Sequence, residues 1–524
     1  MSTWMGRATR TASGVGVLAA VALVVAGGVR LPDVGAGPVS QPARVDVAPS
    51  AVTLTCPSPL ILPTAEGDKA FDPVPVQPVT SVAAVAASSG GTTVAPAAGG
   101  DVLAALAAGG AVAQVPGVST SLAVTAAPTT GSEPEAARVA ASFGSIVTAG
   151  DLRGLSAASC QRPTTDAWLV GGATDLSSTD QLVLSAAGAT PAEVDVTVYG
   201  PSGKVDVTAE HYVVAPGASK VVVLGAVAAE QRRVAVRVRA TGGAVTAYVQ
   251  DSALDGFTPR GTDLVVPGAG PARKQVIPGL SLVAAGVDSP LAGAVRLLVT
   301  GSKAATAHIH LYGPAGEEDL GGAQDVALAP GEVTDVPLGG VPTGSYTAVV
   351  TSDRPVVASG LAARAGAATS VDPNPSTERA WVPSSPAGTS GIVAVPVGTR
   401  GTLVATAVGS SGTATGTLRA IGTDGRVLSE RQVNVPAGTT GAWLTDALVG
   451  TGPIAAGTPG AATPGVRVAG VELVPDDGKV RLAWALVADV PRPDGDLFSV
   501  LSPVPAVADE AAVSVRHDPR LGTR

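Results

Sequence analysis

Two histidines stand one residue apart in a segment with the alternating pattern of a β-strand. His308 and His310 share one face of that strand, because successive side chains point to opposite faces. Acidic residues follow at 317–319, so a metal site built from imidazole and carboxylate groups is conceivable. No HExxH motif or Cys/His cluster accompanies the pair. A solvated strand face is therefore the favoured interpretation, and these histidines are only weak metal candidates.

Other motifs of catalysis are absent or incomplete. No G-x-S-x-G nucleophile elbow occurs, and the four histidines carry no local signature of a catalytic triad. The run GAGPARK from Gly268 lacks the spacing of a phosphate-binding loop and contains Pro271. The acidic run 317–319 indicates a solvated loop rather than a calcium site. The sequence therefore predicts no catalytic residue, no cofactor and no bound metal.

The chain contains two cysteines, Cys56 and Cys160. An even count favours one disulfide if the chain lies in an oxidising compartment. The bond would close a loop of roughly 100 residues, which the chain-entropy model values at about 4.7 kcal/mol. No histidine lies near either cysteine in the sequence, which argues against a catalytic thiol.

A repeated unit makes up most of the chain, so the strands of this unit must position any functional site. AEVDVTVYGPSG at 192–203, ATAHIHLYGPAG at 305–316 and TGTLRAIGTDG at 415–425 all alternate and end in a Gly-x-x-Gly turn. The repeat length is about 110 residues, too long for a propeller blade of about 40–50. Short alternating strands with frequent turns indicate an all-β protein of tandem immunoglobulin-like sandwiches. Units packed into a closed, propeller-like ring are the alternative.

The repeat gives the predicted organisation of the chain. Strands starting at Asp263, Ala380 and Leu497 are interpreted as openings of units, although they could instead pack with the preceding unit. The predicted limits are 1–30 for a signal or anchor helix, 31–50 for a linker, 51–162 for a degenerate first β unit with an Ala/Gly-rich insertion, 163–262 and 263–379 for two further β units, 380–510 for a β unit with a terminal strand, and 511–524 for a flexible tail.

The amino-acid composition of the chain restricts its possible binding partners. The 524 residues carry a net charge of −9, so a nucleic-acid partner is not expected. Hydrophobic residues make up 45% of the chain, enough for substantial cores, whereas charged residues make up only 14%. Trp168, Trp381 and Trp484 recur at strand ends of the repeat, where core packing is favoured over a sugar-stacking platform.

The N-terminal residues predict export. Arg7 and Arg10 precede the uncharged run 12–29, the arrangement of a basic region followed by an apolar segment. The run is near the minimum length of a membrane-spanning helix. It is either retained as a single anchor or cleaved, and both outcomes place residues 40–524 outside the cytoplasm.

Three features of the sequence occur together: the Cys56-Pro57 start, the GLSAASCQRP–WLVGG junction at 154–172 and the strand-turn VDVTVYGPSG. In these features the chain resembles a family of uncharacterised actinobacterial secreted or membrane-anchored proteins that contain a domain of unknown function. Such proteins are often encoded near envelope glycosyltransferases, which implies a cell-envelope role. The family has no assigned catalytic residues, so the resemblance transfers none.

Three functions follow as hypotheses. The first is a non-catalytic extracytoplasmic scaffold or binding module associated with cell-surface glycan assembly, whose partner is an envelope protein or a surface polysaccharide. The second is a surface glycan-acting enzyme with carboxylates and His308/His310 on loops. The third is a structural surface spacer. In all three the N-terminal helix is the contact with the membrane, and nucleic acid is not a partner.

Overall fold

The computed structural model describes residues 43–62, 76–321, 324–367, 375–457, 465–507 and 511–515. The predicted helix at 1–30 lies outside these residues. Within them, no helix is long and apolar enough to cross a membrane. The chain divides into two compact units. One contains β1 (Ala43–Val47) paired antiparallel with β37 (Ala511–Val515), and the other spans Ser50–Ala508.

The unit Ser50–Ala508 is built almost entirely of strands, which confirms the all-β prediction. The helical elements in its described part are α2 (Leu224–Val227) and the 3-10 turn η1 (Thr445–Ala447). Side-chain alternation follows the sequence pattern. In β12, Val194, Val196 and Val198 are buried, whereas Asp195 between them is only partly covered.

The strands form four successive two-sheet sandwiches. Sandwich 1 contains β2 (Val52–Thr55), β3 (Val79–Ser88), β4 (Thr92–Pro96), β5 (Ala104–Leu106), β6 (Ala111–Pro116), β7 (Leu122–Ala126), β8 (Arg138–Val147) and β9 (Gly154–Ser159). Sandwich 2 contains β10 (Asp166–Val170), β11 (Ser178–Ser185), β12 (Ala192–Gly200), β13 (Gly203–Lys204), β14 (His211–Val214), β15 (Ser219–Val223), β16 (Ala235–Thr241), β17 (Thr246–Asp255) and β18 (Thr258–Val265).

The second half of the unit repeats this plan. Sandwich 3 contains β19 (Ala272–Leu282), β20 (Ala294–Val299), β21 (Ala305–Gly313), β22 (Gly316–Glu318), β23 (Val326–Leu328), β24 (Val333–Pro337), β25 (Gly344–Ala365) and β26 (Thr377–Pro383). Sandwich 4 contains β27 (Gly391–Ala394), β28 (Arg400–Val408), β29 (Thr413–Gly422), β30 (Val427–Pro436), β31 (Thr440–Leu444), β32 (Ile454–Ala455), β33 (Val468–Pro475), β34 (Arg481–Val490), β35 (Leu497–Leu501) and β36 (Val504–Pro505).

One strand order recurs in all four sandwiches. Sandwich 1 packs the sheet β2-β7-β4-β5 on the sheet β6-β3-β8-β9, and sandwich 2 packs β10-β16-β12-β13 on β15-β11-β17-β18. Sandwich 4 has the equivalent paths β27-β33-β29-β30 and β31-β28-β34-β35. In sandwich 3 the long strand β25 serves both sheets, because its first half pairs with β19 and β21 and its second half with β20 and β26. The immunoglobulin-like character of the units stays a prediction.

The Ala/Gly-rich part of sandwich 1, predicted to be an insertion, forms regular strands. Ala83, Ala84 and Ala86 on β3 are buried against the opposite sheet. Small side chains fill this core because the flanking valines and leucines supply the bulk. An alanine-rich segment can therefore carry a sheet when its neighbours are larger.

Two strands lie in a different unit from the one that the predicted limits give them. β18 and β26 pair with β17 and β25, so each belongs to the preceding sandwich, as in the alternative interpretation, rather than opening the next. β35 pairs with β34 in the same way and lies within the predicted unit 380–510. The predicted limits at 262/263 and 379/380 fall inside β18 and β26. The strand that closes sandwich 1 in the same way is β9, which pairs with β8.

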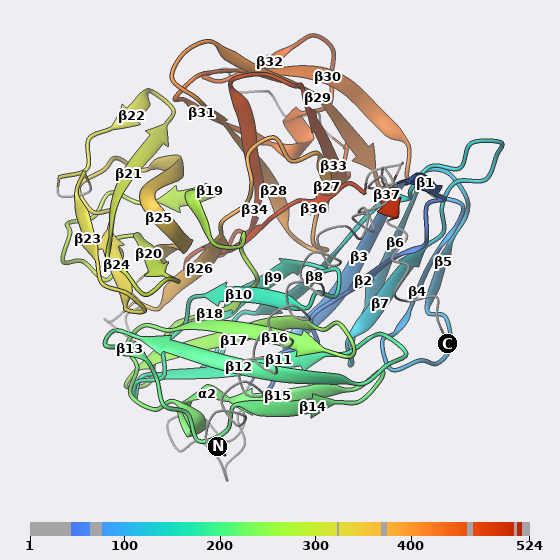
Figure 1. Ribbon diagram of the computed structural model, residues 1–524. Coiled ribbons are helices and arrows are strands. Elements are labelled where there is room, and N and C mark those ends of the chain that lie inside the picture. The colour runs from blue at the N-terminus through green and yellow to red at the C-terminus, as the bar shows by residue number, and fades with distance from the viewer. Residues whose placement is uncertain are drawn as a thin grey trace, which may run out of the picture. The chain divides into compact units, whose positions relative to one another are not determined.

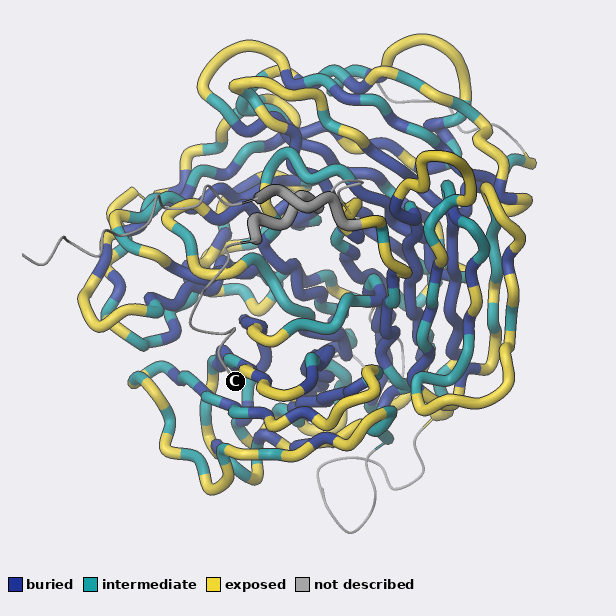
Figure 2. Tube along the Cα trace, turned by 45° about the vertical axis from the view of Figure 1, so that its right-hand side comes forward, coloured by how far each residue is buried: buried dark blue, intermediate teal, exposed yellow. Residues whose placement is uncertain are grey.

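β9, β18, β26 and β35 meet at a common centre. β9 contacts β18, β18 contacts β26, β26 contacts β35, and β35 contacts β9. Figure 1 shows the sandwiches as blue, green, yellow and orange lobes around this centre. Buried segments concentrate toward the middle in Figure 2, whereas exposed turns lie at the periphery. The contacts match the alternative arrangement in which the units close into a ring. We call β9, β18, β26 and β35 the central strands.

The predicted disulfide joins the two ends of sandwich 1. Cys56 follows β2 and Cys160 follows β9, and their sulfur atoms are bonded. Thr55 and Gln161 also exchange backbone hydrogen bonds across the same junction. The bond therefore fixes the chain where it leaves the first central strand.

Replacing both cysteines by serine should lower the free energy of unfolding by about 2–5 kcal/mol, because the unfolded chain regains the freedom of a loop of roughly 100 residues. Guanidinium titration followed by tryptophan fluorescence measures the change. Dithiothreitol should shift the unmodified protein toward the variant and leave the variant unchanged. Equal midpoints for both proteins without reductant would contradict a stabilising role for the bond.

Candidate functional site at the centre of the ring

The central strands carry polar side chains where cores normally exclude them. Asp263 and Glu378 are buried, Asp263 toward the end of β18 and Glu378 at the start of β26. A buried carboxyl group is costly unless hydrogen bonds satisfy it. The partners of these two groups come from other sandwiches, so the polar contacts also hold the ring together.

Asp263 of sandwich 2 accepts hydrogen bonds from two other sandwiches. The backbone N–H of Trp381 on β26 donates to its Oδ2 at 2.7 Å, and the hydroxyl of Ser499 on β35 donates to its Oδ1 at 2.8 Å. Burial raises the pKa of Asp263 to about 8, although these donors oppose the shift. The carboxyl group is therefore largely protonated at neutral pH.

Glu378 of sandwich 3 makes the matching contacts. Its Oε1 accepts the backbone N–H of Leu155 on β9 at 2.8 Å and that of Phe498 on β35 at 3.4 Å. Burial raises the pKa of Glu378 to about 8. The Arg153 guanidinium, whose Nη1 lies 3.9 Å from Oε2, opposes that rise.

Hydroxyl groups complete the contacts between neighbouring central strands. Ser156 on β9 donates to the carbonyl of Thr262 on β18 at 2.9 Å. The Ser499 hydroxyl on β35 also lies 2.9 Å from the carbonyl of Ala157 on β9. Together with the two carboxyl groups, these contacts link every pair among the four sandwiches at the centre.

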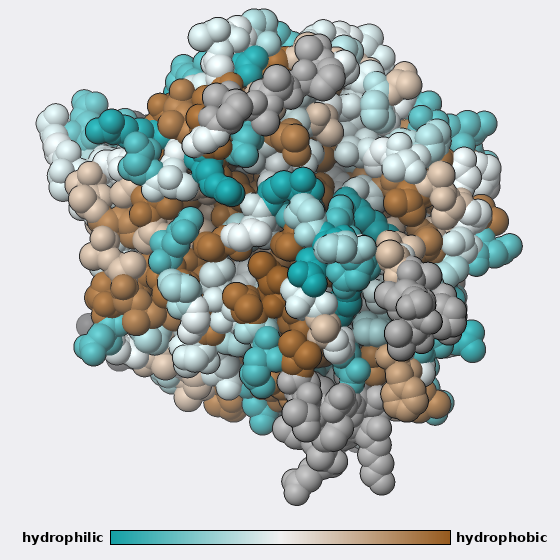
Figure 3. Space-filling model, turned by 180° about the vertical axis from the view of Figure 1, so that it is seen from behind, coloured by the Kyte–Doolittle hydropathy of each residue, from teal (hydrophilic) through white to brown (hydrophobic). Residues whose placement is uncertain are grey.

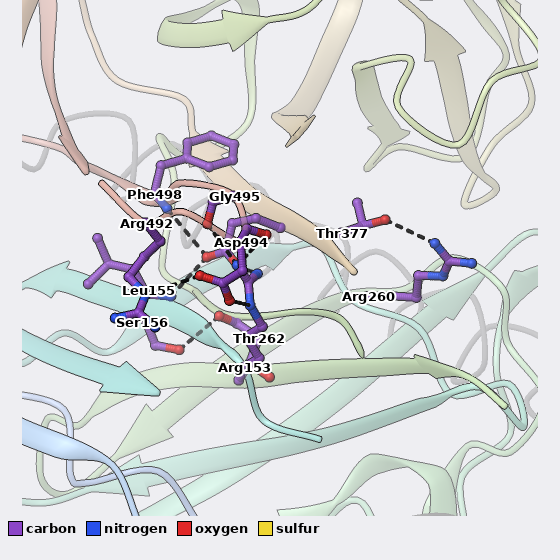
Figure 4. Close-up of polar contacts among 11 residues, drawn as sticks. Arg153, Leu155, Ser156, Arg260, Thr262, Thr377, Arg492, Asp494, Gly495 and Phe498 are labelled. Carbon is purple, nitrogen blue, oxygen red and sulfur yellow. Dashed lines mark hydrogen bonds and ion pairs between the residues drawn. The ribbon is translucent and has the colours of Figure 1, made fainter. Parts of the chain in front are cut away.

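Arg153 ties the start of β9 to the loop before β35. Its Nη2 donates to the carbonyl of Gly495 at 2.7 Å, and its Nε donates to the Asp494 carboxylate at 3.2 Å. Figure 4 shows Arg153, Asp494 and Gly495 close together, with Leu155 and Phe498 beside them. The arginine thus fixes the segment that presents the first central strand.

A second acidic pair lies between sandwiches 2 and 3. Asp180 and Asp251 are cross-strand partners on β11 and β17, and both are buried. Asp251 accepts from Trp381 Nε1 at 2.6 Å and from Arg379. Burial, together with the charge of Asp251, raises the pKa of Asp180 well above its usual value. This side chain is therefore a neutral acid beside a paired carboxylate.

The segments that follow the central strands enclose a cavity of about 330 Å³, which we call the axial cavity. They are 159–164, 266–269, 384–386 and 500–505, one from each sandwich. Prolines, valines and small residues form most of its wall, with serine hydroxyls interspersed. This size and lining are typical of a small-molecule binding pocket.

Hydrogen bonds between sandwiches hold the cavity wall. The Ser159 hydroxyl donates to the Ser502 carbonyl at 2.6 Å, and the Ala269 N–H donates to the Ser384 carbonyl at 2.9 Å. Arg162 Nη2 donates to the Pro505 carbonyl at 2.8 Å. The cavity is therefore a product of ring closure and could not exist in a single sandwich.

A family model described as a family of unknown function, DUF5719, matches residues 123–443, more than half of the chain. The chain belongs to the DUF5719 family. The match includes sandwiches 2 and 3 and the central strands β9, β18 and β26.

No curated protein matches this DUF5719 chain. Among solved structures, one titled "Crystal Structure of Thermotoga maritima 1070" is similar at 18% identity. The alignment covers 21% of this chain and 92% of that one, with a TM-score of 0.16. A similarity this limited carries no argument about fold or function.

The structure places the two candidate histidines of this DUF5719 protein on β21, each with its own acidic neighbour. His310 Nδ1 lies 2.6 Å from Glu317, and His308 Nδ1 lies 3.7 Å from Asp325. Both imidazoles are partly exposed. Within the described part of the chain, no group of three or more His, Cys, Asp or Glu side chains could hold a metal ion. Among these residues, the two histidines therefore do not form a shared metal site.

The recurring tryptophans are buried, as core packing predicts. Trp168 stacks against Tyr199 at 5.8 Å between ring centroids, and Trp484 Nε1 donates to the Thr389 carbonyl at 3.0 Å. Trp381 is held by Asp251 and Asp263 from sandwich 2. The burial of these tryptophans was predictable from the sequence, whereas the acidic partners of Trp381 were not.

One signal could have revealed the polar centre. Charged residues make up only 14% of the chain, yet each central strand contains charged residues or closely follows them. The segments are DLRGL at 151–155, RGTDL at 260–264, TERAW at 377–381 and DGDLF at 494–498. The same feature at four equivalent places is evidence for a shared structural role.

The raised pKa values of Asp263 and Glu378 predict the pH dependence of stability. An acid with a higher pKa in the folded state stabilises the fold below its unfolded pKa, near 4, and loses that contribution as the pH rises through about 8. The free energy of unfolding should therefore fall between pH 5 and pH 9. Asp263→Asn should flatten this dependence and be the more stable protein at pH 9.

Denaturant titrations at pH 5, 7 and 9 measure both effects. Asp101→Asn, at an exposed position, is the matched control and should follow the unmodified protein. An Asp263→Asn variant that is strongly destabilised at pH 5 and keeps the original slope would show that Asp263 is charged in the folded protein.

Proposed function

We propose that this DUF5719 protein is a non-catalytic extracytoplasmic binding module of the cell envelope, associated with cell-surface glycan assembly. The observation that carries the proposal is the axial cavity, to which all four sandwiches contribute one segment. A cavity of about 330 Å³ with apolar walls and dispersed hydroxyls suits recognition of part of an envelope component.

The buried acids support a structural rather than a catalytic use of the charged residues. Asp263 and Glu378 accept backbone amides from neighbouring sandwiches, and Asp251 accepts the Trp381 indole. The hydrogen bonds of these acids are made to the protein itself. Catalytic acids act on a substrate within hydrogen-bonding reach. These contacts instead make the ring rigid, and a rigid ring that presents one cavity suits a scaffold or binding module.

The disulfide supports the proposed location. Structural disulfides persist in oxidising compartments and are rare in the cytosol. In this chain the bond holds the segment after β9, which forms part of the axial cavity. We propose that the N-terminal residues direct export and that they remain as a membrane anchor or are cleaved.

The surface also suits a scaffold with partners. Figure 3 shows separate hydrophobic patches among hydrophilic side chains on the face seen from behind. Phe257 and Leu176 are more than 90% exposed, at the turn between β17 and β18 and at the turn before β11. Contiguous exposed apolar patches mark protein–protein interaction sites, whereas single exposed side chains are common on any protein surface. We propose an envelope protein as a partner at these patches, in addition to a surface polysaccharide.

The binding function can be tested with immobilised full-length protein and envelope polysaccharide purified from the source organism. The unmodified protein should retain polysaccharide, and Ala269→Phe should retain much less, because the added ring fills the axial cavity. A control substitution on the outer surface, Arg426→Gln, should behave like the unmodified protein. Equal retention by the blocked and unmodified proteins, or no retention by either, would refute the cavity-based function.

The proposed location can be tested separately in cells of the source organism. After acid trapping and denaturation without reductant, a maleimide reagent should not modify Cys56 or Cys160, because the pair is oxidised. Reductant before labelling should produce two additions per chain. Two additions without reductant would indicate a reducing compartment and contradict export.

A further inference from the structure

We propose that the axial cavity recognises a carboxylate group carried on a largely apolar body, and that Arg162 binds this carboxylate. The inference rests on the proposed binding function and specifies the chemistry of its ligand. Two features of the cavity support this ligand: its single charged side chain and the apolar character of the rest of its wall.

Arg162 is the single ionisable side chain in the cavity wall, since Cys160 is held in the disulfide. No acidic residue lines the cavity, and Arg162 forms no ion pair within the described part of the chain. Burial lowers the pKa of this arginine, which reflects the cost of removing a cation from water. An arginine nevertheless stays protonated. The cavity thus contains one uncompensated positive charge.

A neighbouring cavity that contains a glutamate does not supply an ion-pair partner for Arg162. Arg162 also borders a smaller cavity of about 160 Å³ that includes Glu472. Glu472 is already paired with Arg138 at 2.7 Å and with Arg419 at 3.1 Å. Two arginines therefore neutralise this carboxylate, and the charge of Arg162 is left for a ligand.

The protein itself uses only part of the Arg162 guanidinium group. Its Nη2 donates to the Pro505 carbonyl at 2.8 Å, whereas its Nε is buried away from the cavity and has no partner. A carboxylate offers two acceptor oxygens and matches the planar guanidinium group. A ligand carboxylate would neutralise the charge of Arg162.

The rest of the wall defines the remainder of the ligand. Val266, Pro267, Val500, Pro503 and Pro386 provide apolar surface around the single cation. A monoanion is neutralised by one arginine, whereas a phosphate dianion would retain an uncompensated charge in apolar surroundings. The cavity therefore favours a monoanion with an apolar body, and among monoanions we assign a carboxylate because its planar shape matches the guanidinium group.

Isothermal titration of the full-length protein with 4-phenylbutanoate and its uncharged analogue 4-phenylbutanamide tests the inference. The carboxylate should bind at least about tenfold more tightly than the amide, a difference of about 1.4 kcal/mol. Arg162→Gln should remove this preference while amide binding persists, and Arg162→Lys should retain part of it. Arg426→Gln, a solvent-exposed arginine, is the matched charge control and should leave both affinities unchanged.

The outcomes separate this inference from the binding function. Equal affinity of the unmodified protein for both probes would overturn the carboxylate preference and leave the cavity as a binding site. Ala269→Phe should abolish binding of both probes, because it fills the cavity without removing Arg162. If the Arg162→Gln variant also fails to bind 4-phenylbutanamide, the affinities of the unmodified protein for the two probes decide whether it prefers the carboxylate. Failure of both probes to bind the unmodified protein would overturn the carboxylate site itself, and the polysaccharide experiment then decides the proposed function.

Discussion

The arrangement of the four sandwiches depends on buried carboxyl groups that accept backbone amides from a neighbouring unit. Glu378 reaches β9 and β35 from β26, and Asp263 reaches β26 and β35 from β18. In an apolar centre, a carboxyl group or amide without a hydrogen-bond partner costs free energy, so each partner requires the other. This requirement selects one relative placement of four units that could otherwise slide on apolar faces. Specificity, more than net stabilisation, is what such buried polar contacts provide.

Ring closure has a functional consequence at the ends of the central strands. The segment that follows each central strand forms part of the wall of the axial cavity. Because the central strands are held rigidly, the geometry of the cavity is rigid as well. The Cys56–Cys160 bond adds a covalent restraint to the segment that contains Gln161 and Arg162. A cavity whose wall is shared by four units is sensitive to any loss of ring contacts. Preorganisation of this kind reduces the cost of ordering a binding site.

Local features of the chain were predictable from the sequence, and long-range ones were not. Alternation placed Val194 and Val196 in the core, and repeat length indicated units of about 110 residues. The cysteine count also predicted the disulfide. The strand at Asp263 was assigned to the wrong side of a unit border, because its partner strand and its hydrogen-bond donors cannot be read from local pattern. Trp381, its main donor, lies 118 residues away. Arg162 was missed because an isolated arginine in a turn has no distinctive spacing.

Hydrogen exchange of the Glu378→Ala variant, followed by mass spectrometry, tests the central claim most directly. Peptides covering β9 and β35 should exchange faster than in the unmodified protein, since the Leu155 and Phe498 amides lose their acceptor although they belong to other sandwiches. Glu317→Ala, at an exposed position of the same sandwich, should leave these peptides unchanged. Faster exchange confined to sandwich 3, with β9 and β35 unaffected, would contradict a ring held together by its buried acids.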